Sequence, residues 1–171
     1  CINYTKDVAM KYIKLAGSCL NQTPLDFRGN TRNILSAIEE AKEEGVQILC
    51  LPELSISGYG CEDAFYNKYI LDRSLEALEE IVEASEDITL CVGLPMEYES
   101  CLYNVVAIIH DQELWGFVPK QNLPGDGIYY EPRWFKAWPS EVIVNYKWEE
   151  SLYPFGDLIF EIDGVRIGLE I

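Results

Sequence analysis

Histidine and positive charge are scarce in this sequence of 171 residues. It has one histidine, and 13 Lys and Arg stand against 29 Asp and Glu, which gives a net charge of −16 at pH 7. A surface of that sign repels phosphate backbones and anionic membrane faces, so we expect no nucleic-acid and no membrane partner. With one imidazole and no Cys-x-x-Cys pair, the sequence also lacks the donors of a structural zinc site, and we predict no metal.

Long apolar runs and the pattern of a secretory signal are also missing. The six cysteines are sparse, and Cys50 and Cys91 lie in the apolar runs VQILCLP and ITLCVGLP, which is typical of buried free thiols. We therefore expect a reducing, cytoplasmic compartment. We interpret residues 1–9, before Met10, as an N-terminal extension or a cloning remnant, and residues 10–171 as part of one domain.

Hydrophobic periodicity predicts alternating strands and helices in the first half of the chain. A strand over 12–20 precedes a loop, and then Asn30 begins a helix that ends at Gly45. Residues 46–52 form a continuous apolar run, the pattern of a strand covered on both faces. After the glycine-rich turn 57–63, a helix continues to about Ser85; before it, Asp63 is a possible cap of a separate short turn.

The second half is predicted to be richer in strands. Residues 88–95, 104–110 and 113–119 have strand patterns, the last two joined as a hairpin, followed by a long loop from 121 to about 154. Two final strands, 158–162 and 165–171, flank the hairpin signal Asp163-Gly164. We expect an α/β fold in which helices cover one face of a mixed sheet and a second sheet covers the other. Because the sequence ends within a strand pattern, we interpret the domain as incomplete at its C-terminus.

Glu53 and Lys120 each follow an apolar strand pattern, at the end of a strand where α/β sheets usually place their sites. A glutamate there is suited to proton transfer, and a lysine with little water around it to holding an oxyanion. Considered alone, a glutamate or a lysine at the end of a strand is more often a solvated side chain than a functional one. Cys61 is the cysteine most easily placed in a loop, but Glu62 and Asp63 are expected to raise its thiol pKa, so we interpret it as structural.

Four stretches taken together resemble the nitrilase, or carbon–nitrogen hydrolase, superfamily. They are LNQTPLDFRGN, LCLPELSISGYGCEDAF, GFVPKQNLPGDGIYYEPRWF and IFEIDGVRIGLEI, and the resemblance runs from about Lys11 to Ile171. Leu-Pro-Glu-Leu and Lys-x-x-Leu-Pro mark the superfamily, whereas GYGCEDAF and GDGIYYEPRWF are similar to the branch of N-terminal glutaminase domains of glutamine-dependent NAD synthetases. The resemblance implies a four-layer αββα sandwich.

The resemblance also implies roles for individual residues. Glu53 corresponds to the general base, Lys120 to the residue that holds the oxyanion, and Glu131 to a second glutamate that orients the lysine. Tyr59 corresponds to a residue that shapes the glutamine pocket, and Tyr129 to an aromatic residue near the bound side chain.

The nucleophile of the family is a cysteine directly after the strand that here reads IGLEI, so the resemblance implies a cysteine after Ile171. Cys61 also begins a Cys-Glu-Asp triplet, but it follows Glu53 by eight residues and lies on a different segment. We therefore interpret Cys61 as a decoy and expect the 171-residue segment alone to be inactive.

The function implied is hydrolysis of glutamine, with the ammonia passing to a linked synthetase domain that is not in this sequence. ATP and Mg²⁺ are expected for that synthetase domain only, and no cofactor for the glutaminase step. A homo-oligomer is expected as well. Two alternatives stay open: a stand-alone amidase of the same superfamily acting on another carboxamide, and a non-catalytic interaction module of the same fold.

Overall fold

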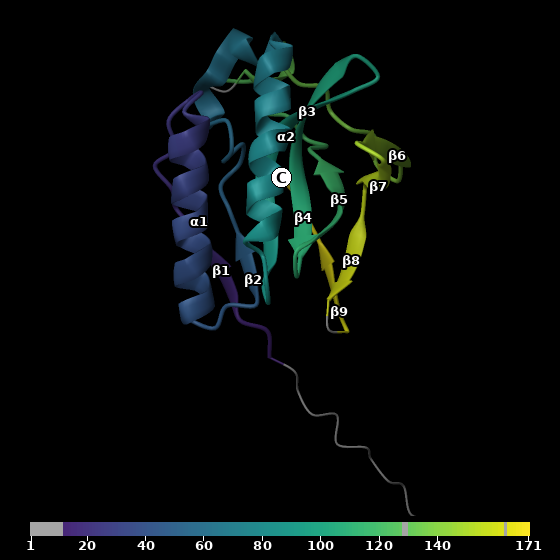
Figure 1. Cartoon of the computed structure of the whole chain (residues 1–171). Helices are drawn as coiled ribbons and strands as arrows, with labels where there is room; N and C mark the ends of the chain where they lie inside the picture. The colour runs from purple at the N-terminus through teal and green to yellow at the C-terminus, as the bar shows by residue number, and fades with distance from the viewer. Residues whose placement is uncertain (1–11, 128–129, 163) are drawn as a thin grey trace, which may run out of the picture.

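Two amphipathic helices lie side by side over one face of the main sheet (Figure 1). The computed structural model describes residues 12–127, 130–162 and 164–171, so the proposed extension 1–9 lies outside the described residues. Helix α1 spans Phe27–Glu43 and helix α2 spans Lys68–Glu83, which confirms both predicted helices. None of the helices in the described part of the chain is long and apolar enough to cross a membrane.

The predicted cap of α1 is wrong by four residues. Asp26, not Asn30, caps the helix, and its side chain accepts a hydrogen bond from the Gly29 amide. Asn30 is buried in the first turn, where its side chain donates to the backbone oxygens of Thr23 and Ile56. The asparagine therefore holds two loops against the helix rather than capping its N-terminus.

The main sheet has seven strands in the order β1-β2-β3-β4-β5-β7-β6. Strands β1, β2 and β3 are parallel, β3, β4 and β5 form antiparallel pairs, β5 and β7 are parallel, and β6 and β7 are antiparallel. The hairpin of β4 and β5 around Asp111 and Gln112 is confirmed. The bounds are Leu15–Gly17, Ile48–Cys50, Thr89–Tyr98, Cys101–His110, Glu113–Pro119, Ile143–Trp148 and Ser151–Gly156 for β1 to β7.

Two parts of the fold differ from the sequence predictions. The predicted loop 121–154 contains β6 and most of β7, an edge hairpin whose exposed positions and internal Pro154 hide the strand pattern. The predicted glycine-rich turn is the 3₁₀ segment η1, Tyr59–Tyr66, which has Gly58 at its cap position. Asp63 does not cap a turn, because its carboxylate pairs with Arg133.

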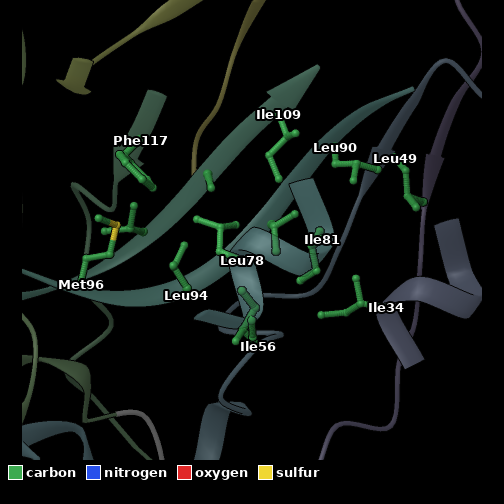
Figure 2. Packing of buried hydrophobic residues seen from close by; sticks show 14 of the residues in the cluster. Ile34, Leu49, Ile56, Leu78, Ile81, Leu90, Leu94, Met96, Ile109 and Phe117 are labelled. Carbon is green, nitrogen blue, oxygen red and sulfur yellow. The ribbon is translucent and has the colours of Figure 1, made fainter. Parts of the chain in front are cut away.

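The main sheet is buried on both faces. Figure 2 shows Ile34 of α1 and Leu78 and Ile81 of α2 packed toward sheet residues such as Leu90 and Leu94. On the opposite face the sheet packs against a two-stranded sheet, β8 (Ile159–Ile162) paired with β9 (Val165–Gly168). The buried residues of this second interface are Ile48, Cys91, Val106, Ile108, Val118, Leu158, Phe160 and Ile162.

The second sheet confirms the prediction that helices cover one face and strands the other. Fully burying one Leu, Ile or Phe side chain contributes about 1.5–3 kcal/mol, so both interfaces stabilise the fold. The described residues thus form the α, β and β layers of the predicted αββα sandwich.

Candidate active site

Glu53 lies in a tight turn that follows β2. The Ser55 amide donates to the Pro52 oxygen at 3.1 Å, and the Ile56 amide donates to the Gly93 oxygen on β3 at 3.1 Å. A Cβ atom on Gly93 would lie 2.4 Å from the backbone nitrogen of Leu54. Because Gly93 has no side chain, the turn lies directly against β3 and carries Glu53 toward the next strand.

Lys120 directly follows β5 and is held by its own backbone. Its amide donates to the Asn104 oxygen at 2.8 Å, and its oxygen accepts from the Trp138 amide at 2.9 Å. The residue is 6% exposed. Its Nζ lies 2.6 Å from Oε1 of Glu53, so the two predicted strand-end residues form an ion pair.

Glu131 completes this charged cluster from the 3₁₀ segment η2, Glu131–Arg133. It is 2% exposed, and its Oε1 and Oε2 lie 3.2 and 3.1 Å from Nζ of Lys120. Tyr59 of η1 donates its hydroxyl to Oε1 of Glu131 at 2.6 Å. The structure therefore brings together four of the five predicted site residues, and the fifth, Tyr129, lies outside the described residues.

The arrangement of charges suits stabilisation of an oxyanion. An ammonium group has three N–H donors. Glu53 and Glu131 engage Nζ of Lys120 from two sides, which leaves one donor for a third oxygen. The two carboxylates also offset the cost of burying the cation. A substrate carbonyl beside Nζ would meet a positive charge that is already oriented.

Asn104 is a site residue that sequence reasoning missed. It lies on β4, is 1% exposed, and donates from Nδ2 to Oε1 of Glu53. The signal in the sequence was weak: one amide side chain beside the apolar run Val105–Ile109. It becomes meaningful only when the Glu53 turn is known to lie over β3.

A second missed feature joins the two 3₁₀ segments that carry Tyr59 and Glu131. Nε and Nη2 of Arg133 lie 2.8 Å from the two carboxylate oxygens of Asp63, and the Trp134 indole donates to Asp63 at 3.0 Å. The Arg133 guanidinium and the Trp134 donor lower the pKa of Asp63 to about 2. We call these three residues the Asp63 clamp.

Cys61 is buried within η1. Its thiol lies 3.1 Å from the Ser57 oxygen and 3.2 Å from the Gly58 oxygen. Burial, rather than the acidic neighbours Glu62 and Asp63, raises the pKa of the Cys61 thiol. Its position agrees with a structural role. Among the thiols predicted to be free and buried, Cys91 is both, and Cys50 is free but only partly buried.

The aromatic residues of the long loop serve mainly in packing. Trp138 is buried against Tyr103 and Phe155, and Phe135 packs on Phe65. Tyr130, next to Glu131, is exposed. Within the described ranges, no group of three or more His, Cys, Asp or Glu side chains could hold a metal ion.

The last residues of the sequence line a cavity beside the end of β5. A cavity of about 220 Å³ is lined by Pro119 and Gln121, the two chain neighbours of Lys120, and also by Leu169, Glu170 and Ile171. Ile171 therefore shares a cavity with the backbone that holds the lysine.

Comparison with known proteins shows the family of this chain. Residues 14–171 match the family described as carbon–nitrogen hydrolase, so the chain belongs to the carbon–nitrogen hydrolase family. It is 34% identical over 170 residues to the glutamine-dependent NAD(+) synthetase of Rattus norvegicus, covering 93% of this chain and 23% of that protein. It is 37% identical over 139 residues to the enzyme of the same name from Dictyostelium discoideum, covering 80% and 20%.

Solved structures show the same relationship. A glutamine-dependent NAD(+) synthetase from Cytophaga hutchinsonii superposes with a TM-score of 0.89 at 44% identity, covering 91% of this chain and 27% of that chain. An amidase from Nesterenkonia sp. shares the fold, with a TM-score of 0.64 at 23% identity over 80% of this chain and 51% of that chain. The chain spans about a quarter of the length of the synthetases it matches.

Proposed function

We propose that this chain carries the general base, the oxyanion-binding lysine and the second carboxylate of a glutaminase that supplies ammonia for NAD synthesis. The observation that supports this most directly is the Lys120 ammonium held between Glu53 and Glu131. The proposal is also supported by the similarity of this chain to enzymes named glutamine-dependent NAD(+) synthetases.

The chemistry follows from these residue types and a thiol nucleophile. Glu53 takes the thiol proton, and the sulfur attacks the side-chain carbonyl carbon of glutamine. The carbonyl oxygen becomes an oxyanion beside Nζ of Lys120. The C–N bond then breaks as protonated Glu53 returns the proton to the nitrogen. Ammonia departs, and the acyl group remains on the sulfur as a thioester. Glu53 next takes a proton from water, and the water oxygen attacks the thioester carbon. The C–S bond breaks, glutamate is released, and Glu53 returns the proton to the sulfur.

The nucleophile in this proposal is a cysteine directly after Ile171. The cavity that Ile171 lines together with Pro119 and Gln121, the two chain neighbours of Lys120, supports this placement. Cys61 is unsuited to the role, since burial raises the pKa of its thiol.

The wider setting of the proposal is a cytoplasmic homo-oligomer with a linked, ATP- and Mg²⁺-dependent synthetase domain that uses the ammonia. Light scattering of the full-length protein tests the assembly, and a trap for free ammonia during turnover tests the transfer. A monomer that releases all its ammonia to solvent would contradict both. The glutaminase step is proposed to need no metal, so a chelator should leave glutamine hydrolysis unchanged.

Glu53→Gln and Lys120→Met in the full-length protein test the site. Each should lower glutamine hydrolysis by about 10² or more while ammonia-driven synthesis continues. Glu62→Gln and Lys136→Met are matched controls, because both residues are exposed and lie outside the cluster. Near wild-type hydrolysis in either site variant would contradict the proposal. A panel of carboxamides tests the substrate: faster turnover of an amide other than glutamine would favour a stand-alone amidase.

A further inference from the structure

Asn104 is buried although its side-chain oxygen has no hydrogen-bond partner among the described residues. Its side chain makes one hydrogen bond, from Nδ2 to Oε1 of Glu53, and within the described residues its Oδ1 has no hydrogen-bond partner. A buried, unpaired amide oxygen costs folding free energy. An apolar side chain of similar shape would avoid that cost, so stability does not explain an asparagine here.

The Glu53 carboxylate shows what the asparagine does. Oε1 of Glu53 accepts from two donors, Nζ of Lys120 and Nδ2 of Asn104. The two donors lie on neighbouring segments, which are joined by the hydrogen bond from the backbone amide of Lys120 to the backbone oxygen of Asn104. Both donors therefore approach Oε1 from a fixed direction.

Occupation of Oε1 leaves the other oxygen for chemistry. In the described part of the chain no side chain or amide donates to Oε2 of Glu53, and the Glu53 side chain is 30% exposed although Lys120 beside it is buried. We propose that Asn104 is a positioning residue that fixes the carboxylate plane of Glu53, so that Oε2 takes the thiol proton and later the water proton. This inference rests on the proposed glutaminase function.

Asn30 provides a matched comparison. It is also 1% exposed, but its amide is fully used by backbone groups: it donates to the Thr23 and Ile56 oxygens and accepts from the Thr23 amide. Asn30 has the bonding of a structural asparagine. Asn104 makes its one bond to the carboxylate that the mechanism uses.

The test compares Asn104→Leu with Asn30→Leu in the full-length protein. For Asn104→Leu we expect an unchanged or higher Tm, a fall in kcat of about tenfold or more, and a KM for glutamine within about twofold of wild type, since a buried Asn104 does not touch substrate. For Asn30→Leu we expect a lower Tm and a kcat per folded molecule close to wild type.

A second variant, Asn104→Ala, removes the donor without adding bulk or charge, so kcat should fall in it as well even if the leucine variant does not fold. A kcat within twofold of wild type in either folded Asn104 variant would overturn the inference. A fall in Tm for Asn104→Leu as large as that for Asn30→Leu would assign Asn104 a structural role and also overturn it. Absence of glutamine hydrolysis in the wild-type protein would instead refute the proposed function.

Discussion

Lys120 and Glu53 are 67 residues apart in the sequence, yet Nζ of the lysine lies 2.6 Å from Oε1 of the glutamate. Their strands are not neighbours, since β3 and β4 lie between β2 and β5. The turn after β2 closes the distance by lying on β3 at Gly93 and reaching Asn104 on β4. One end of the four adjacent strands β2 to β5 therefore brings Glu53, Asn104 and Lys120 together.

Removal of the lysine should destabilise the protein as well as inactivate it. Lys120→Met leaves Glu131, which is 2% exposed, without its cation. Breaking a buried pair in this way costs on the order of 3 kcal/mol. We expect a clearly lower Tm for Lys120→Met and recovery of most of it in the double variant Lys120→Met/Glu131→Gln, without recovery of glutamine hydrolysis. Thermal unfolding of both variants checks this, and equal Tm values for the single and double variants would contradict it.

The Tyr59 hydroxyl should contribute to turnover through Glu131. Tyr59→Phe removes the 2.6 Å hydrogen bond to Oε1 of Glu131 and leaves the ring in place. A hydrogen bond to a charged group contributes about 1.5–3 kcal/mol to stability, so we expect a lower Tm together with a fall of about tenfold or more in kcat/KM for glutamine. Tyr66→Phe is the control, because Tyr66 bonds the Arg133 backbone oxygen instead. Equal effects of the two variants would show that the Glu131 bond is unimportant.

The sequence was sufficient for features that depend on local patterns. Glu53 and Lys120 could be placed because each directly follows an apolar strand, and the family motif added Glu131 and Tyr59. Asn104 could not be found in this way, because its role depends on the contact between the Glu53 turn and Gly93. The cap of α1 was misplaced for a related reason: the tertiary contacts of Asn30 with Thr23 and Ile56 decide what that residue does.

Cys61 should be a slow-reacting thiol that is dispensable for turnover. Burial raises the pKa of its thiol, so the reactive thiolate is rare at neutral pH. We expect Cys61→Ala to keep glutamine hydrolysis near the wild-type rate. In the wild-type protein, alkylation of Cys61 should be slow at pH 7 and accelerate only above the usual thiol pKa of about 8.5, as followed by peptide mass spectrometry. Loss of glutamate release in Cys61→Ser, with the fold intact, would make Cys61 the nucleophile instead.

The Asp63 clamp should make the link between η1 and η2 insensitive to pH until strongly acidic conditions. Asp63 accepts two hydrogen bonds from Arg133, and its pKa is about 2, compared with about 3.9 for an unperturbed aspartate. Because the pKa is lowered by folding, the clamp stabilises the folded state fully above the unfolded-state pKa. That contribution is lost as the pH falls toward 2.

The variant Asp63→Asn tests this linkage through its difference from wild type. We expect a lower urea midpoint than wild type at pH 7 and at pH 5, and a difference that shrinks between pH 4 and pH 2 as wild-type Asp63 takes up its proton. Arg133→Gln should show the same pH dependence. The double variant should be about as stable as either single variant, because both changes break the same pair. A difference that is absent at pH 7, or that persists unchanged at pH 2, would show that the Asp63 carboxylate does not hold η1 and η2 together.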